Sequence, residues 1–272
     1  MTLPVQASHT LKETAFIEGL LRELADYVRA RYGERHTVDI SAKRDANDLV
    51  TEVDVAVQQQ AQQRIAEAFP HDRFIGEEEG CDVIPSEVGL RAWVMDPIDG
   101  TQNFVRSMYP AFGISLAFVE GGVIRASGVM MPIDNDLFLA ERGGGTLRNG
   151  QLIRVSDVPS VELARLEVDF GGRHVRARTL EVGSELMRQV GQIRCHCAAV
   201  IGLCSVACAD TDAYIHVGLK PWDYAASVLI VEEAGGVVSR MDGSPIRVFG
   251  DRHDVIATNG RFHAELLDTL TP

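Results

Sequence analysis

Three segments of the chain end an apolar run in carboxylates, the side chains that bind divalent cations and transfer protons. The central segment, residues 93–101, reads WVMDPIDGT. Proline cannot extend a ladder and glycine permits a sharp turn, so we expect Asp96 and Asp99 at the carboxyl end of a strand and Thr101 at the start of a helix. Free backbone N–H groups at a helix start attract an anion. An ordinary Asp/Gly turn is the alternative, but it does not explain why two acids lie so close together in the chain.

The other two acidic segments lie on either side of the central one in the chain. Residues 74–80 read FIGEEEG and contain Glu77 and Glu78, for which a solvated charge run is the alternative. Residues 220–223 read KPWD and end in Asp223, just before a predicted helix. If the segments converge, each close pair of like charges costs about 4 kcal/mol at an effective dielectric constant of about 20. Oxygen ligands of this kind select Mg2+ or Mn2+, and two such ions about 3.5–4 Å apart stabilise the attacking and leaving oxygens of a phosphoryl group.

The composition bounds the size of the protein and its partners. At 272 residues the chain is long enough for one large domain or two closely packed units. The net charge of −13 argues against a nucleic-acid or anionic-membrane surface, because binding phosphates needs clustered Lys and Arg. We expect a small-molecule partner, and an anionic one would need bound cations to reverse the local field. No apolar run approaches the roughly 20 residues of a membrane span, and residues 1–10 lack a signal-peptide pattern, so we expect a cytoplasmic protein.

Five cysteines are present, and four of them lie close together: Cys195, Cys197, Cys204 and Cys208. Their spacing does not match the paired ligands of zinc fingers. We therefore expect buried, reduced thiols in an alanine-rich helix. Cys81, beside the glutamates, is the candidate for a reactive thiol.

Hydrophobic periodicity predicts the elements that position the acids. In the first half we expect a helix over 11–31 and a loop or short hairpin over 38–48. A second helix should begin at a capping box formed by Thr51 and Asp54 and end at Pro70. An antiparallel meander should follow, with strands over 112–118, 123–131 and 137–140. In the second half we expect strands over 163–170, 193–195, 213–217, 236–239 and 255–258, and helices over 179–190, 198–209, 224–233 and from 260. Helices between strands predict a layered α/β architecture, with a boundary between two halves at 145–160.

These motifs together resemble those of the inositol monophosphatase family of metal-dependent phosphatases. Residues 93–106 resemble the family's first signature and residues 222–236 its second, and residues 76–78 and 48–54 resemble two further blocks in the right order. The resemblance covers most of the chain. It implies an α/β (α+β) fold, the layered αβαβα sandwich of sugar phosphatases, as well as lithium inhibition and a homodimer.

The resemblance divides the chain into an N-terminal α+β half, residues 1–150, and a C-terminal α/β half, residues 151–272. It also implies how metal ions are bound. The first ion would be bound by Glu77, Asp96 and the backbone carbonyl of Ile98. The second would be bound by Asp96, Asp99 and Asp223. A third, weaker ion would depend on Glu77. The cofactor implied is Mg2+, two or three ions, with Mn2+ as the alternative.

Catalytic roles follow from the same resemblance. A metal-bound water would be the nucleophile, oriented by Glu77 and Thr101, and Asp54 would form a hydrogen bond with Thr101. Lys43 falls where the family places a lysine on a mobile loop. From the sequence alone, Asp54 could equally be a helix-start acid and Lys43 a solvated loop lysine.

The substrate-binding residues that the resemblance implies are Asp99, Gly100, Thr101, Ala199, His216 and Asp223. His216 departs from the family, whose inositol-acting members carry a glutamate there that hydrogen-bonds the sugar hydroxyls. Histidine can still donate to or accept from a hydroxyl, but it loses bidentate acceptance. A pocket-wall histidine without substrate contact is the alternative, so the substrate is left open.

The implied function is a Mg2+-dependent phosphomonoesterase for a small phosphorylated metabolite, with inositol monophosphate as the leading substrate. Related branches hydrolyse histidinol phosphate, fructose 1,6-bisphosphate or 3′-phosphoadenosine 5′-phosphate. An aspartyl-phosphate phosphatase is disfavoured, because its paired aspartates are separated by a single residue whereas two residues separate Asp96 from Asp99. The alternative from another class is a non-catalytic, metal-dependent regulatory protein on the same scaffold.

Overall fold

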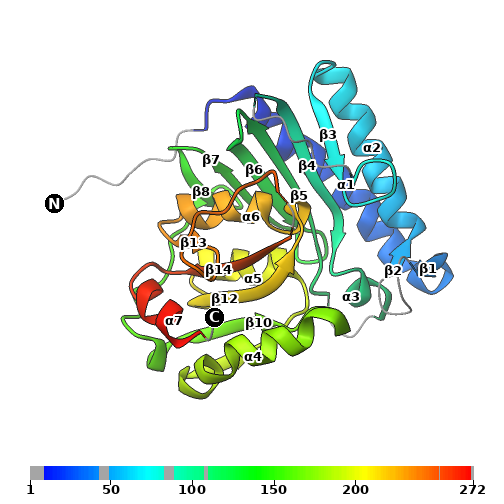
Figure 1. Ribbon diagram of the computed structural model, residues 1–272. Coiled ribbons are helices and arrows are strands. Elements are labelled where there is room, and N and C mark those ends of the chain that lie inside the picture. Colours follow the sequence, from blue (N-terminus) through cyan, green and yellow to red (C-terminus); the bar gives the residue numbers. More distant parts are fainter. Residues whose placement is uncertain (1–8, 43–48, 83–88, 107–109, 251, 271–272) are drawn as a thin grey trace.

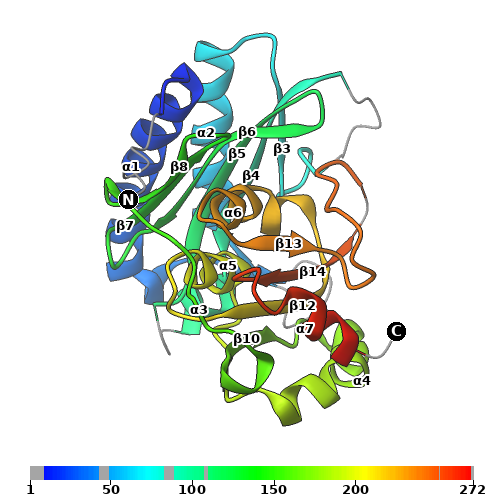
Figure 2. The same cartoon turned by 90° about the vertical axis from the view of Figure 1, so that its left-hand side faces the viewer.

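Two large β-sheets alternate with layers of helices in the computed structural model, which describes residues 9–42, 49–82, 89–106, 110–250 and 252–270 (Figures 1 and 2). The helices are α1 (Lys12–Gly33), α2 (Glu52–Ala68), α3 (Thr101–Arg106), α4 (Arg173–Gln189), α5 (Ala199–Ala207), α6 (Pro221–Glu233) and α7 (His263–Thr269). None of these helices, within the described part of the chain, is long and apolar enough to cross a membrane.

The strands fall into the two large sheets and one short hairpin. The hairpin strands are β1 (Ile40–Ala42) and β2 (Leu49–Thr51). The first large sheet contains β3 (Arg73–Gly76), β4 (Arg91–Asp99), β5 (Gly113–Glu120), β6 (Val123–Met131), β7 (Asp136–Glu141), β8 (Gly145–Arg148) and β9 (Gln151–Leu152). The second contains β10 (Arg165–Asp169), β11 (Gln192–Arg194), β12 (Ala213–Leu219), β13 (Val237–Ser239) and β14 (His253–Thr258).

The first large sheet follows the order of the chain from β3 to β9. Strands β3 and β4 are parallel and every later pair is antiparallel, so the predicted meander is confirmed. Side chains alternate between the two faces of β4. Trp93 and Met95 pack in a core with α1 and α2, and Val94 packs in a core with α5 and α6. Because helices cover both faces, β4 is an almost continuous apolar run.

The second large sheet has the order β11-β10-β12-β14-β13. Strand β10 is parallel to β11 and β12, whereas β14 is antiparallel to β12 and β13. Leu186 of α4 and Leu266 of α7 pack with Val168 and Ile215 on one face. The other face packs against α5 and α6, which completes the predicted αβαβα sandwich (Figure 2).

Helices α5 and α6 lie between the large sheets and contact both of them. Almost every residue of these helices is buried, as expected for helices that are apolar on all sides. One core cluster therefore contains residues from both sheets, for example Ile75 of β3 and Val255 of β14. The division into residues 1–150 and 151–272 stays a prediction.

Two helices begin earlier than the sequence pattern indicated. Helix α4 begins at Arg173 rather than Thr179, because Arg173 and Arg176 in its first turn are exposed and give no apolar periodicity. Helix α6 begins at Pro221 rather than Tyr224. Proline suits the first position of a helix, since its φ angle is preset and no N–H partner is needed there.

The prediction of buried helical thiols is wrong for two of the four clustered cysteines. Cys204 is buried in α5 and Cys208 is half-buried at its end, but Cys195 and Cys197 are exposed and precede the helix. The expectation of a reactive Cys81 stays a prediction. Burial and then Asp82 raise the pKa of Cys81, which disfavours the nucleophilic thiolate.

We expect Gly202→Ala to destabilise the protein, because α5 packs tightly on β12 at this position. A Cβ on Gly202 would lie 2.3 Å from ring atoms of Tyr214 and 3.0 Å from Cγ of Glu167. Chemical denaturation should show a loss of about 1–3 kcal/mol in the free energy of unfolding. The control is Gly19→Ala on the exposed face of α1, where nothing lies within 4 Å and a gain of about 0.5–1 kcal/mol is expected. Equal effects of the two substitutions would contradict this packing.

Candidate active site

Strand β4 ends at Asp99, and α3 begins at Thr101, as the sequence predicts. The register with β5 shifts between Asp96 and Asp99, so the strand accommodates its proline in a β-bulge. Gly100 has a φ angle of +88°, and a Cβ on it would lie 2.9 Å from the carbonyl oxygen of Ala111. Glycine is therefore required at the turn that separates the two aspartates from the helix.

A chain of hydrogen bonds connects the start of α2 to the start of α3. The hydroxyl of Thr101 lies 3.1 Å from Asp54 Oδ1 and 3.0 Å from the carbonyl oxygen of Ile98, and can donate to either. Asp54 is fully buried, and its Oδ2 accepts hydrogen bonds from the backbone N–H and the hydroxyl of Thr51 at 2.9 and 2.5 Å. Asp54 is thus both the acid of the capping box and the partner of Thr101, so its two sequence interpretations are compatible.

Ser115 connects the central motif to α6. Asp96 is 2% exposed, and its backbone N–H donates to Ser115 Oγ at 3.4 Å. The hydroxyl of Ser115 donates to the carbonyl oxygen of Trp222 at 3.1 Å, next to Asp223. Ser115 was not among the predicted site residues, and its only signal is a polar residue in the apolar run 112–118.

Ser115 is the first of three hydroxyls that fix the position of α6 on the first large sheet. Ser127 Oγ donates to the carbonyl oxygen of Ala226 at 2.8 Å, and Thr146 Oγ1 donates to that of Ile230 at 2.7 Å. The three accepting carbonyls, those of Trp222, Ala226 and Ile230, are spaced four residues apart, which is about one helical turn. These bonds set both the rotation and the axial position of α6, and therefore where Asp223 lies.

Asp99 is the centre of a crowded group of acids. Burial raises the pKa of Asp99 well above its ordinary value, and three neighbouring acids raise it further: Asp223, Asp169 and Glu77. The backbone N–H of Val200, 2.7 Å from Asp99 Oδ2, acts in the opposite direction. The structure therefore brings together acids from β4, α6, β10 and the segment after β3. Asp169 was missed because nothing in its local sequence marks it.

The donor set fits a hard divalent cation. The implied ligands offer only oxygen atoms: the carboxylates of Glu77, Asp96, Asp99 and Asp223, and the carbonyl of Ile98. Burial and then the neighbouring acids raise the pKa of Asp99, so both disfavour its negative charge in the protein alone. A bound Mg2+ or Mn2+ ion would remove that repulsion, so the residues present suit the cofactor that the sequence implies.

The three consecutive glutamates lie in three different environments. Glu77 is half-buried, Glu78 is 6% exposed and Glu79 is exposed. Gln58 of α2 fixes the segment, since its Oε1 accepts the backbone N–H of Glu78 at 2.9 Å. A Cβ on Gly76 would lie 2.3 Å from the same oxygen, so the glycine allows this approach. The segment is therefore built into the fold and is not a uniformly solvated charge run.

Two of the residues proposed for substrate contact, His216 and Ala199, lie on the second large sheet and α5. His216 of β12 is the register partner of Asp169 of β10. Burial lowers the pKa of His216 to about 4, so the ring is neutral near neutral pH, and its Nδ1 has no hydrogen-bond partner in the described part of the chain. Ala199 is buried at the first turn of α5. Lys43 lies outside the described residues.

Asn103 is a further residue that the sequence analysis did not single out. Its Nδ2 donates to the carbonyl oxygens of Ala111 and His196, both at 2.7 Å. One side chain of α3 therefore holds the segment before β5 and the segment before α5. Asn103 lies within the first signature, but the sequence offered no way to identify its two partners.

A five-layer αβαβα sandwich that gathers buried acids at the end of β4 is the arrangement that the sequence analysis expects of a metal-dependent phosphatase. Comparison with protein-family models agrees, since residues 11–271 match the model described as the inositol monophosphatase family. The chain belongs to the inositol monophosphatase family, whose members are phosphoric monoester hydrolases.

Individual relatives match over most of this chain. The chloroplastic phosphatase IMPL1 of Arabidopsis thaliana is 38% identical over 234 residues, which cover 83% of this chain and 62% of the relative, less than two thirds of its length. The fructose-1,6-bisphosphatase/inositol-1-monophosphatase of Thermotoga maritima is 34% identical over 255 residues, covering 92% and 93%. The crystal structure of the extragenic suppressor protein suhB from Bartonella henselae has a TM-score of 0.86 at 28% identity, covering 95% of this chain and 98% of that chain.

We expect Asp99→Asn to stabilise the metal-free protein. The substitution removes a charge that three acids repel, while the amide oxygen can still accept the N–H of Val200. In the presence of a chelator the free energy of unfolding should rise by about 1 kcal/mol, and saturating Mg2+ should abolish the difference.

The matched control is Asp134→Asn, an exposed acid in the turn between β6 and β7, which should change the free energy of unfolding by less than about 0.5 kcal/mol. It separates local repulsion from the general reduction of a net charge of −13. A destabilised Asp99→Asn variant in chelator would show that the acids do not repel one another.

Proposed function

We propose that this phosphatase uses Mg2+ to hydrolyse the phosphate ester of a small metabolite, with inositol monophosphate as the first candidate. The observation that carries the proposal is the group of acids around Asp99 at the start of α3. The proposed ligands of two or three ions are Glu77, Asp96, the carbonyl of Ile98, Asp99 and Asp223. When bound, such ions lower the pKa of a water molecule towards neutrality and neutralise charge on the phosphoryl group.

The proposed catalytic residues orient the attacking water. A hydroxyl has one proton and two lone pairs. Because Thr101 directs its proton to Asp54 or to the carbonyl oxygen of Ile98, its lone pairs can accept a hydrogen bond from water. Glu77 accepts a proton from that water, and Asp54 keeps the hydroxyl of Thr101 oriented. The deprotonated water attacks phosphorus in line while the P–O bond to the alcohol breaks, the leaving alkoxide takes up a proton from solvent, and no covalent enzyme intermediate forms. A role for Lys43 stays a prediction.

The substrate is proposed to lie between α3 and the second large sheet. Backbone N–H groups of Gly100 and Thr101 would bind the phosphate, and Ala199 and His216 would contact the alcohol part. The Thermotoga maritima relative, whose name gives both fructose 1,6-bisphosphate and inositol monophosphate as substrates, supports a sugar or cyclitol phosphate. Histidinol phosphate and 3′-phosphoadenosine 5′-phosphate are the further candidates, because His216 replaces the glutamate of the inositol-acting members.

A purely regulatory role is disfavoured. The alternative is a non-catalytic regulatory protein that still binds metal. Such a protein would have no need of the complete set of proposed catalytic and metal-binding residues, which this chain retains: Glu77, Asp96, Asp99, Thr101 and Asp223. The cytoplasmic location, the homodimer and inhibition by lithium stay predictions.

We expect Glu77→Gln to reduce Mg2+-dependent phosphate release by about 10²–10⁴-fold, because the amide neither accepts the proton of the water nor supplies a metal-binding charge. Glu79→Gln, the same change two residues away at an exposed position, should retain full activity. Release of phosphate from inositol monophosphate is the measurement, with a chelator control that should abolish it. Equal activity of the two variants would remove Glu77 from the mechanism.

We expect His216→Glu to raise kcat/KM for inositol monophosphate relative to the other candidate phosphates by about 10–100-fold, since a hydrogen bond to a charged acceptor contributes about 1.5–3 kcal/mol. His216→Gln, which is neutral and of similar size, should give no such gain. Steady-state kinetics over the four candidate phosphates measure the change. An unchanged preference would identify His216 as a wall residue without substrate contact.

A further inference from the structure

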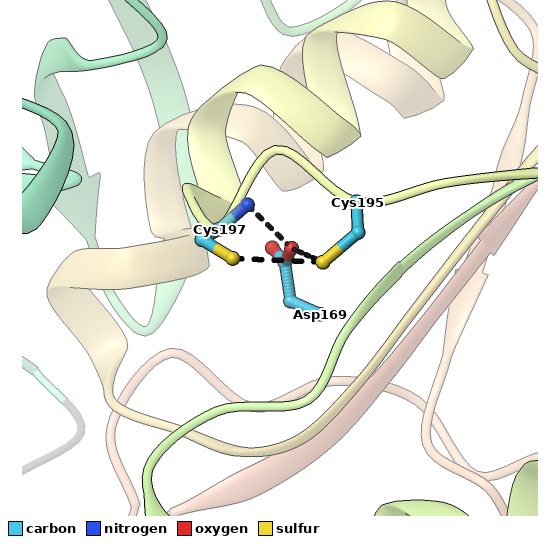
Figure 3. Close-up of side chains that lie close together, drawn as sticks. All are labelled: Asp169, Cys195 and Cys197. Atoms are coloured by element: carbon cyan, nitrogen blue, oxygen red, sulfur yellow. Dashed lines mark hydrogen bonds between the residues drawn. The ribbon is translucent and has the colours of Figure 1, made fainter. Parts of the chain in front are cut away.

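A second group of side chains that could bind a metal ion adjoins the all-oxygen set. Asp169 points towards the thiols of Cys195 and Cys197 (Figure 3). The Sγ atom of Cys195 lies 3.7 Å from Asp169 Oδ1 and 3.5 Å from the Sγ atom of Cys197. One ligand atom from each residue lies within 4.8 Å of the others. We call these three residues the thiol site.

The second large sheet brings the thiol site together. Asp169 is the last residue of β10, and β11 runs parallel to β10 and ends one residue before Cys195. Cys197 then has a φ angle of +59°, which is unusual for a residue with a side chain, and the turn directs its thiol towards that of Cys195 (Figure 3). Residues from two strand ends and one turn therefore meet at a single point.

Asp169 is fixed in a position suited to a ligand. It is 3% exposed, its Oδ2 accepts the hydroxyl of Tyr214 at 3.1 Å, and its Oδ1 accepts the backbone N–H of Cys197 at 2.7 Å. Hydrogen bonds of this kind orient carboxylate ligands in metal sites. Cys195 and Cys197 are exposed, so an ion can reach the site from solvent.

The distances fit a tetrahedral ion. With Zn–S bonds of about 2.3 Å and a Zn–O bond of about 2.1 Å, tetrahedral geometry places two sulfurs about 3.8 Å apart and a sulfur and an oxygen about 3.6 Å apart. The observed separations are 3.5 Å between the sulfurs and 3.7 Å from Cys195 to Asp169. The observed separations differ little from the tetrahedral values, so a small movement of the thiols would place all three ligand atoms at bonding distance from one ion.

We propose that Asp169, Cys195 and Cys197 bind a thiophilic divalent ion, with Zn2+ as the first candidate, and leave a fourth position open to solvent. Thiolates select such ions over Mg2+, which distinguishes the thiol site from the all-oxygen set. His196 is not one of the residues whose ligand atoms lie within 4.8 Å of one another, and its Nδ1 is in contact with Glu167 at 2.9 Å. On binding, the thiols lose their protons to solvent and no oxidation takes place.

An ion at the thiol site would act on the neighbouring active site through a short segment. Three residues after Cys197, the backbone N–H of Val200 donates to Asp99 Oδ2 at 2.7 Å. Asp169 itself is one of the acids that raise the pKa of Asp99. Fixing Cys197 therefore fixes a hydrogen-bond donor to an acid of the phosphatase site.

The test uses the full chain, kept reduced with a phosphine and freed of metal, in millimolar Mg2+ so that the oxygen ligands are filled. We expect one equivalent of Co2+ to produce the near-ultraviolet charge-transfer absorption that only thiolate ligands give, and one equivalent of Zn2+ to remove it. Cys195→Ser and Cys197→Ser should each weaken binding by at least about 100-fold, and Tyr214→Phe, which frees one oxygen of Asp169, by about 10-fold. Cys208→Ser, which removes a thiol at the far end of α5, should bind as the wild type does.

Circular dichroism of each variant checks that the fold is retained, and native mass spectrometry counts the bound zinc independently of activity. Absence of the charge-transfer absorption in the wild type would overturn the proposal. Unchanged Co2+ affinity in a folded double variant, C195S/C197S, would also overturn it. So would a Cys195–Cys197 disulfide that persists in the reductant, because its sulfurs could not then be thiolate ligands.

Discussion

Repulsion between crowded carboxylates is the interaction on which the rest of this structure depends. Asp99 carries a raised pKa because burial and three other acids disfavour its charge. Such a group persists only where hydrogen-bond donors or cations compensate it. The fold supplies backbone donors at fixed positions: the N–H of Val200 for Asp99, of Ile98 for Asp96 and of Lys220 for Asp223. Each donor lies at a helix start or at the β-bulge, so the acids lie at the end of β4 and in the first turn of α6.

The two sheets form one site because the helices between them are fixed in register. Three hydroxyls of the first large sheet donate hydrogen bonds to carbonyl oxygens on successive turns of α6. Asn103 donates a hydrogen bond to the segment that leads into α5. Small residues let the layers approach closely, as Gly202 does beneath the ring of Tyr214. Positions in α5 and α6 that look like ordinary core thus determine where Asp223 and the donor to Asp99 lie.

Asp169 connects two kinds of chemistry. Through space it raises the pKa of Asp99, in a set of ligands that offers only oxygen. Through hydrogen bonds it contacts Cys197 and Tyr214, beside two exposed thiols. The carboxylate oxygens around Asp99 and the thiols of Cys195 and Cys197 are therefore separated only by Asp169 and by the turn before α5. This separation would allow the two proposed ions to bind in close proximity without competing for the same ligands.

The sequence by itself determined the features that depend on local patterns. The capping box of Thr51 and Asp54, the end of β4 at Asp99, the meander and the layered architecture all follow from periodicity, turn residues and motif spacing. Only the tertiary structure decided the contacts between distant segments: the bridge from Ser115 to Trp222, the place of Asp169 beside Asp99, the neutral ring of His216 and the exposed pair of thiols. The physical reason is that burial, electrostatic coupling and hydrogen bonding act through space. Residues separated by many positions in the chain carry no local mark of the neighbours that folding gives them.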